Sequence, residues 1–256
     1  MPELPEVETI RRQLATILVG RRVTGIEVRE EKSYLGPKRV DQVITKVGRV
    51  GKYLYFDFAD GSMWEIHLKM TGRLIWDRAD YEKAKHTRVV VVMEGGKLYF
   101  WDTRKFGYIR VVSERKQLGK DPWEMSEAEL MRKLQKTGRS VKEAILDQSL
   151  LAGVGNIYAN DGLWEARINP KQKANTLTIP QVKKLLSSLR RVMERGLATG
   201  GASDNSYVNA KGEMGSYQNE FLVYGRTGEP CNRCGTKLER IVVGGRGTWV
   251  CQKCQL

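Results

Sequence analysis

Residues 231–254 read "CNRCGTKLERIVVGGRGTWVCQKC", and this stretch contains all four cysteines of the 256-residue chain. The cysteines form two CxxC pairs, Cys231 with Cys234 and Cys251 with Cys254, separated by sixteen residues. Each CxxC turn can bind one zinc ion through two thiolates, and two turns joined by a hairpin complete a tetrahedral site. Four thiolates leave no coordination position for water, so the sequence predicts one structural Zn²⁺ ion.

The residues between the two cysteine pairs predict a β-hairpin with an arginine at its tip. Arg246 stands between Gly245 and Gly247 in "ERIVVGGRGTWV". The small glycines allow the backbone to approach a phosphate closely while the guanidinium forms a forked pair of hydrogen bonds with it. Arg246 is therefore a candidate phosphate ligand. The alternative, an ordinary basic turn residue, is equally compatible with these residues alone.

The composition of the whole chain favours a polyanionic partner. There are 44 Lys+Arg residues against 30 Asp+Glu, a net charge of +14 and a sequence pI near 9.7. Such an excess attracts nucleic acid or an anionic membrane. We find no long apolar run, lipidation motif or signal-peptide-like N-terminus, which favours nucleic acid and a cytoplasmic, nucleoid-associated protein. In that compartment, two disulfides or four free thiols are disfavoured alternatives to zinc.

Segments of different composition predict an α+β fold. Residues 1–112 hold an opening helix and then most of the strand signal, in "VTGIEV", "GKYLYFDF", "MWEIHLKM", "TRVVVVM" and "KLYFWD". These runs predict an N-terminal β-sandwich domain with the helix packed against it. "EGGK" at 94–97 predicts a tight hairpin. The polar residues 113–125, with Gly119 and Pro122, predict a linker.

Residues 126–225 have the periodicity of helices. "SEAE" at 126–129 predicts a capping box of Ser126 with Glu129. "AGVGNIYAN" at 152–160 is a glycine-punctuated turn between two helical stretches, which predicts a helix–turn–helix-like module. A further helix is predicted from six apolar residues on one stripe: Val182, Leu185, Leu186, Leu189, Val192 and Met193. Residues 226–256 are predicted to form the zinc finger.

The first residues, "MPELPEVE", contain two prolines with different interpretations. Pro5 suits the first turn of a helix whose apolar positions include Val7, Ile10 and Leu14. That role does not account for Pro2. Its simplest interpretation is a residue that stiffens the end of the chain.

Other candidates for binding chemistry are a turn asparagine and a group on the sandwich. Glycines beside a helix start expose backbone N–H groups, and Asn156 adds a side-chain donor, although such glycines also permit close helix packing. A basic surface with an exposed Phe and Met can insert into a base stack while it holds phosphates. Strand alternation places Met70 on one face with Ile66 and Leu68, so core packing is its alternative. The sandwich candidates are Lys52, His67, Met70, His86, Arg104 and Phe106.

Taken together, these motifs resemble one known family over essentially the whole chain. "MPELPEVETIRRQL", "GKYLYF", "HLKMTGRL", "DTRKFG", "GVGNIYA", "YVNAKGEMGSYQ", "VYGRTGEPC" and the four-cysteine finger are similar to those of the formamidopyrimidine-DNA glycosylase family. The resemblance implies a helix-two-turns-helix DNA-binding domain at 126–225. It also implies a bifunctional DNA glycosylase and AP lyase of base excision repair, which excises 8-oxoguanine and formamidopyrimidines from damaged double-stranded DNA. No small-molecule cofactor is implied, and a monomer is expected.

The resemblance also implies a role for Pro2. Members of the family lose the initiator methionine, and the exposed proline is the nucleophile that forms a Schiff base with the sugar. An α-amino group has a pKa of about 8 against about 10.4 for lysine, so near neutral pH its lone pair is available a few hundred times more often. A secondary amine condensed with C1′ gives an iminium with no N–H to lose, which acts as an electron sink for β,δ-elimination.

The remaining roles follow from the resemblance position by position. Glu3 is implied as the acid/base residue, Lys52 as the lysine that contacts the lesion and assists elimination, and Arg246 as the finger arginine that grips the lesion phosphate. Asn156 and His67 match phosphate-contacting positions, and His86 matches another DNA contact. The set that fills the void left by the extruded base is Met70, Arg104 and Phe106, with Arg104 pairing with the orphaned cytosine and Phe106 wedging beside it.

The chain departs from the family pattern at two places. Asp204 and Asn205 stand where many relatives carry a basic residue, and Asp161 stands where a glutamate is common. A basic DNA contact expected between Lys136 and Lys142 has no clear position. Two other functions stay open: an oxidised-pyrimidine glycosylase of the endonuclease VIII type, which typically has glycine after the first glutamate, and a non-catalytic zinc-finger DNA-binding protein.

Overall fold

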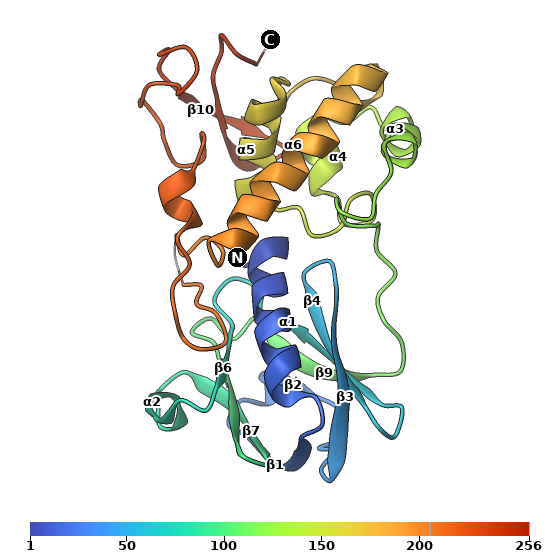
Figure 1. Ribbon diagram of the computed structural model, residues 1–256, viewed down its shortest axis with the longest axis vertical. Helices are drawn as coiled ribbons and strands as arrows, with labels where there is room; N and C mark the ends of the chain where they lie inside the picture. The colour runs from blue at the N-terminus through green and yellow to red at the C-terminus, as the bar shows by residue number, and fades with distance from the viewer. Residues whose placement is uncertain (205, 256) are drawn as a thin grey trace. The chain divides into compact units, whose positions relative to one another are not determined.

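The computed structural model describes residues 1–204 and 206–255, which divide into two compact units (Figure 1). Unit 1 consists of Met1–Lys116 and Gly196–Gln218, and unit 2 of Gln117–Arg195 and Asn219–Leu256. Asn205, one of the two residues that depart from the family pattern in the loop after Gly200–Gly201, lies outside the described residues.

Unit 1 contains the opening helix, α1 (Leu4–Leu18), and a sheet of nine strands in the order β2-β9-β5-β4-β3-β1-β7-β8-β6. The pairs are antiparallel except for the parallel pair β2–β9. A short helix, α2 (Ala79–Glu82), and a 3-10 turn, η1 (Glu31–Ser33), connect strands. The strands are β1 (Arg22–Val28), β2 (Tyr34–Leu35), β3 (Gln42–Val50), β4 (Tyr53–Phe58), β5 (Met63–His67), β6 (Arg73–Trp76), β7 (Thr87–Met93), β8 (Gly96–Trp101) and β9 (Tyr108–Val112).

The two halves of this sheet, joined where β1 pairs with β3, enclose one hydrophobic core with α1. Phe56 and Trp64 come from one half and Val91 and Phe100 from the other, and all four are buried. The helix contributes its apolar stripe, in which Ile10 is fully buried. The predicted sandwich with a helix packed against it is therefore confirmed, as is the tight hairpin at 94–97, where Met93 pairs with Gly96.

The predicted strand through "MWEIHLKM" is wrong at its end. Strand β5 stops at His67, and Lys69 adopts a φ of 52°, so alternation no longer applies to Met70. The backbone N–H of Gly72 donates to the carbonyl of Leu68 at 2.8 Å, and a Cβ at Gly72 would lie 2.5 Å from that oxygen. This tight turn directs Met70 outward, with 43% of its surface exposed, instead of into the core beside Ile66.

Unit 2 is built from helices and a two-stranded hairpin. The predicted apolar stripe is buried along the longest helix, as expected for its spacing. At the start of α3, Ser126 accepts from the N–H of Glu129, but the Glu129 carboxylate accepts from Lys120, so the predicted capping box forms only in part. The elements are α3 (Glu127–Gln135), α4 (Val141–Leu146), α5 (Asn156–Ala166), η2 (Ala174–Thr176), α6 (Ile179–Ala198), η3 (Tyr217–Glu220), β10 (Glu239–Val243) and β11 (Arg246–Val250).

The division into units differs from the predicted domains in one segment. Residues 196–218 group with unit 1, although the sequence places them within a domain at 126–225. The reason is a set of hydrogen bonds to α1: the N–H of Ala202 donates to Glu6 at 2.8 Å, and that of Ala210 donates to Gln13 at 2.9 Å.

Within residues 1–204 and 206–255, no helix is both long and apolar enough to cross a membrane.

Candidate active site

The N-terminal end of α1 holds the first two candidate residues. Pro2 is buried, and Glu3, at the N-cap of the helix, is 4% exposed. The N–H of Glu3 donates to Oε2 of Glu6 at 2.7 Å, and the other oxygen of that carboxylate accepts from Ala202. Glu6, which the sequence analysis did not select, therefore ties the start of the chain to the loop that follows Gly201.

Gly201 is the residue that permits this close approach. Its φ of +95° is favourable only for glycine, and a Cβ there would lie 2.8 Å from Cγ of Glu6 and 2.9 Å from the ring of Tyr207. The buried Tyr207 packs in the same core as α1. The loop is thus fixed against the first turns of the helix at the end where Pro2 lies.

Lys52 and His67 are both buried at the ends of neighbouring strands. Lys52, 7% exposed, follows Gly51 in the turn between β3 and β4. The Nδ1 of His67 accepts from the N–H of Lys69 at 2.9 Å, which leaves the proton on Nε2. Burial, and then the charges of Lys69, Lys52 and Lys116, lower the pKa of His67 to about 3. His67 is therefore a neutral hydrogen-bond donor at physiological pH.

A buried aspartate organises the loop that presents Arg104 and Phe106. Asp102 is fully buried and accepts from the N–H groups of Arg104 (3.1 Å), Phe106 (2.9 Å) and Gly107 (2.8 Å). Lys105 between them has a φ of 59°. The exposed Phe106 ring lies 4.8 Å from the Arg104 guanidinium carbon, in a cation–π contact.

The same aspartate also holds the turn that carries Met70. The hydroxyl of Thr71 donates to Oδ1 of Asp102, and the N–H of Arg104 donates to that hydroxyl at 3.3 Å. The three candidate void-filling residues therefore come from two loops that meet at one carboxylate. Sequence reasoning missed Asp102, although its place at the start of the motif "DTRKFG" offered a signal.

His86 is linked to Asp102 by a hydrogen bond between their backbones. The N–H of Asp102 donates to the carbonyl of His86 at 2.9 Å. The His86 ring is half-buried, stands edge-on to Trp101 with ring centroids 5.5 Å apart, and its Nδ1 lies 3.1 Å from Arg88. His86 thus belongs to the same part of unit 1 as Arg104 and Phe106.

In unit 2, Asn156 is bonded to the hairpin that carries Arg246. Asn156 is the first residue of α5, and its Nδ2 donates to the carbonyl of Gly247 at 3.1 Å. Arg246 is exposed at the start of β11, opposite Val243, after a turn formed by two glycines with positive φ. The buried Oδ1 of Asn156 has no hydrogen-bond partner among the described residues. The predicted hairpin is confirmed, but Gly244 and Gly245 form its tip, and Arg246, which was predicted there, is the first residue of β11.

A buried lysine fastens this hairpin to the helices. The Nζ of Lys142 donates to Thr248 Oγ1 (2.6 Å), to the carbonyl of Gly247 (3.0 Å) and to Asn160 Oδ1 (3.3 Å). Lys142 is fully buried, so in this unit it acts as an internal tether. The sequence analysis could not place the basic DNA contact expected between Lys136 and Lys142, and in the structure Lys142 is a buried internal residue.

The shortened carboxylate at position 161 has a structural role. Asp161 is fully buried and accepts from the N–H groups of Leu222 (3.2 Å), Val223 (3.0 Å) and Tyr224 (3.1 Å). It therefore holds the chain segment that leads into the finger. Although the side chain of aspartate is one methylene shorter than that of glutamate, its carboxylate still reaches the N–H groups of three successive residues.

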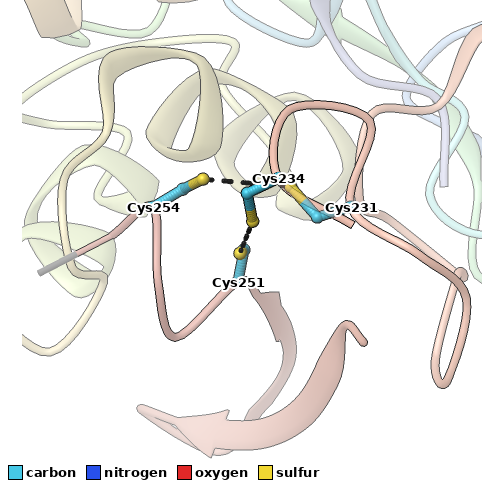
Figure 2. Close-up of side chains that lie close together, drawn as sticks. All are labelled: Cys231, Cys234, Cys251 and Cys254. Atoms are coloured by element: carbon cyan, nitrogen blue, oxygen red, sulfur yellow. Dashed lines mark hydrogen bonds between the residues drawn. The ribbon is translucent and has the colours of Figure 1, made fainter. Parts of the chain in front are cut away.

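The four cysteines form one cluster, shown in Figure 2. Their sulfur atoms all lie within 4.8 Å of one another, with Sγ–Sγ distances of 3.9 Å for Cys231–Cys254 and 3.5 Å for Cys234–Cys251. A tetrahedral zinc ion with Zn–S bonds of about 2.3 Å requires sulfur atoms about 3.8 Å apart. The four side chains therefore fit one structural zinc ion. Cys231 and Cys251 also pack against Trp164 and Leu238 in a small core.

Comparison with protein families divides the chain into three matched segments. Residues 1–109 match the formamidopyrimidine-DNA glycosylase N-terminal domain, and residues 118–207 match the formamidopyrimidine-DNA glycosylase H2TH domain. Residues 228–256 match the zinc finger found in FPG and IleRS.

Whole-chain comparisons agree with these matches. The formamidopyrimidine-DNA glycosylase of Desulfitobacterium hafniense is 42% identical over 274 aligned positions that cover all of both chains, and that of Bacillus subtilis is 36% identical. Among solved structures, a mutant of the Lactococcus lactis FPG in complex with Fapy-dG-containing DNA has a TM-score of 0.92, 34% identity and 99% coverage of both chains. The MutM (FPG) protein of Thermus thermophilus has a TM-score of 0.89 and 38% identity, covering 99% of this chain and 98% of the other.

Proposed function

The chain belongs to the formamidopyrimidine-DNA glycosylase family, and we propose that Pro2 is the nucleophile of its reaction. The protein is a DNA glycosylase and AP lyase for oxidised purines in damaged DNA, with one structural zinc ion. The observation that carries the assignment of Pro2 is the clamp at the start of α1. There, Glu6 binds both the residue after the proline and the loop at Ala202.

In the first half of the reaction, the bond from C1′ of the sugar to the damaged base is replaced by a bond from C1′ to the protein. Once methionine is removed, the nitrogen of Pro2 attacks C1′ of an extruded nucleotide as the glycosidic bond breaks and the purine leaves. Loss of the nitrogen's proton and opening of the C1′–O4′ bond give an iminium. Glu3, buried beside the proline, is the proposed proton donor to the opening sugar ring.

The second half cleaves the strand twice. The iminium acidifies the C2′ proton, so its removal expels the 3′ phosphate by β-elimination, and δ-elimination then expels the 5′ phosphate. Lys52 is the proposed contact to the lesion and its phosphate, and Arg246 the group that assists the second elimination. The zinc ion, when bound by the four cysteines, holds the hairpin that presents Arg246 and takes no part in bond breaking.

Binding of the duplex is assigned to the remaining candidates. Asn156 and His67 are proposed phosphate contacts, and neutral His67 suits that task as a donor through Nε2. Extruding a base costs a few kcal/mol and leaves a void in the stack. Met70, Arg104 and Phe106, which are exposed on two loops joined at Asp102, are proposed to fill it, with Arg104 facing the orphaned cytosine. We also propose a monomer located at the nucleoid in the cytoplasm.

Borohydride trapping tests this function against its two alternatives. The processed protein is mixed with duplexes that carry 8-oxoguanine opposite cytosine, thymine glycol, or no lesion. We expect a covalent adduct mainly with 8-oxoguanine. An adduct mainly with thymine glycol would favour an oxidised-pyrimidine enzyme, and no adduct with any duplex would favour a non-catalytic DNA-binding protein.

A Pro2→Gly variant isolates the nucleophile. We expect it to lose most cleavage while it still binds the damaged duplex, because the phosphate contacts lie elsewhere. Binding is measured by fluorescence anisotropy and cleavage under single-turnover conditions. Unchanged cleavage by this variant would remove Pro2 from the mechanism.

A further inference from the structure

Glu8, in the second turn of α1, is a buried carboxylate that the mechanism above does not use. It is 7% exposed and accepts hydrogen bonds from three guanidinium groups. Arg11 donates from Nε (2.9 Å) and Nη2 (2.8 Å), Arg12 from Nε (2.9 Å) and Arg49 from Nε (3.0 Å). Burial by itself raises the pKa of Glu8, but these three arginines outweigh it and hold the pKa at about 2. The carboxylate is therefore ionised throughout the working pH range.

Arg49 differs from the other two partners because it comes from the sheet. It lies near the end of β3, its side chain is 11% exposed, and its Nη1 donates to the carbonyl of Gly51 at 3.1 Å. That carbonyl belongs to the same planar peptide group as the N–H of Lys52. One rigid guanidinium thus connects the helix to the peptide that carries Lys52, in a turn where Gly51 has a φ of +55°.

We propose that Glu8 and Arg49 are a positioning pair that aligns Lys52 with the N-terminal proline. The proposal rests on the proposed roles of Pro2 and Lys52. Glu8 follows Glu3 by five residues, about 8 Å along the helix axis, so the pair fixes the helix against the turn close to its catalytic end. A misplacement of about 1 Å between reacting groups can cost about 100-fold in rate.

Arg12 provides a matched control. It donates to the same carboxylate, but it lies on α1 itself, and 59% of its side chain is exposed. Arg12→Ala removes one partner of Glu8 without touching the link to the turn. We expect its single-turnover rate to stay within about twofold of the unmodified protein.

The decisive experiment is a double-mutant cycle between positions 49 and 52. Arg49→Met, Lys52→Ala and the double variant are compared in single-turnover cleavage of an 8-oxoguanine duplex, with DNA affinity and melting temperature measured in parallel. We expect Arg49→Met to slow cleavage by about 10- to 100-fold with DNA affinity within about threefold. We expect the double variant to be no slower than Lys52→Ala, because Arg49 acts through Lys52.

A merely structural role for Arg49 would give a different pattern. The losses in the double variant would then multiply, or Arg49→Met would lower the melting temperature with an unchanged cleavage rate, and either result would overturn the proposal. Lys52→Ala with full activity would instead remove Lys52 from the proposed function, and the positioning role with it. Should Arg49→Met fail to fold, Arg49→Lys keeps the charge for Glu8 without the planar fork, and the same cycle with it decides.

Discussion

The two units hold their functional residues by opposite kinds of buried groups. In unit 1, three buried carboxylates do so: Glu6 and Asp102 accept from backbone N–H groups, and Glu8 accepts from arginines. In unit 2, a buried lysine and four thiolates hold the hairpin with Arg246, and the one buried carboxylate described above, Asp161, holds the segment that leads into the finger. In a chain of net charge +14, buried acids fix the proposed catalytic end, whereas the hairpin itself is held by a cation and by the four cysteines. The two units should therefore be destabilised by different treatments: unit 1 by neutralising its buried carboxylates, and unit 2 by removing zinc.

Removal of zinc should produce the largest effect, and it should be confined to unit 2. Structural zinc contributes about 10 kcal/mol or more to small finger folds, and chelation leaves four clustered thiolates without their ion. We expect a chelator to abolish cleavage and to expose amides of residues 228–255 to hydrogen exchange, while amides of β3–β8 stay protected. Restored cleavage on adding Zn²⁺ is the control. Equal loss of protection in the sheet would break the comparison.

Asp102→Asn should produce the largest effect of a single side chain in unit 1. The amide group keeps one acceptor oxygen but directs a donor at backbone N–H groups, so several buried donors lose their partner. We expect a loss of about 3–4 kcal/mol in the free energy of unfolding and reduced discrimination of the base opposite the lesion. Urea denaturation and cleavage of duplexes with each opposite base measure the two effects.

The exposed Asp80 provides the control for this substitution. Its carboxylate pairs with Arg78 at the surface, and 58% of its side chain is exposed. Because an exposed ion pair contributes little to stability, Asp80→Asn should leave the urea midpoint essentially unchanged. If the two aspartate variants lose equal stability, the buried carboxylate at position 102 does not organise the loops.

The contribution of Glu8 should appear as a loss of stability in acid. The pKa of its carboxyl is held at about 2 in the folded chain, against 4.5 ordinarily, so its contribution is complete above pH 4.5 and is lost as the pH falls towards 2. The difference in unfolding free energy between the unmodified protein and Glu8→Gln should shrink by about 3 kcal/mol over that range. A difference that is independent of pH between about 2 and 5 would contradict the three-arginine arrangement.

Among the buried groups, Lys142→Met should have the smallest effect, although the lysine is fully buried. Each of its three acceptors keeps another hydrogen bond: Asn160 with Trp249, Gly247 with Asn156, and Thr248 with the carbonyl of Arg246. We expect a loss of about 1–2 kcal/mol and faster release of zinc to a chromogenic chelator. If Lys142→Met lost more unfolding free energy than Asp102→Asn, the buried lysine of unit 2 would matter more for stability than the buried carboxylate of unit 1, contrary to this account.

The zinc site and the fold class could be predicted because residue identity and local spacing encode them. The spacing of the two CxxC pairs is enough to predict a zinc site without knowledge of the rest of the fold. The runs of β-branched and aromatic residues predicted five of the nine strands in the sheet of unit 1. The strand at Gln42–Val50 was not predicted, because Thr45, Lys46 and Arg49 interrupt its apolar pattern. The alternative interpretation of Met70, as a core residue, rested on strand alternation, which stopped applying where the chain left its strand.

The groups that position the site could not be predicted, because their partners are distant in the sequence. Glu6 meets a residue 196 positions later, Arg49 meets one 41 positions earlier, and Lys142 meets one 106 positions later. A local pattern shows Glu6 and Glu8 only as favourable acids at a helix N-terminus. Their role comes from distant segments that the fold brings to α1: the loop at Ala202 for Glu6 and strand β3, through Arg49, for Glu8.

The most direct test of the central claim is mass spectrometry of the borohydride-trapped complex. After reduction with an 8-oxoguanine duplex and digestion, the account predicts that the sugar remnant is attached to the nitrogen of Pro2, in a chain that has lost Met1. Active protein that retains Met1, or a remnant on the side chain of Lys52 or another amine, would contradict it.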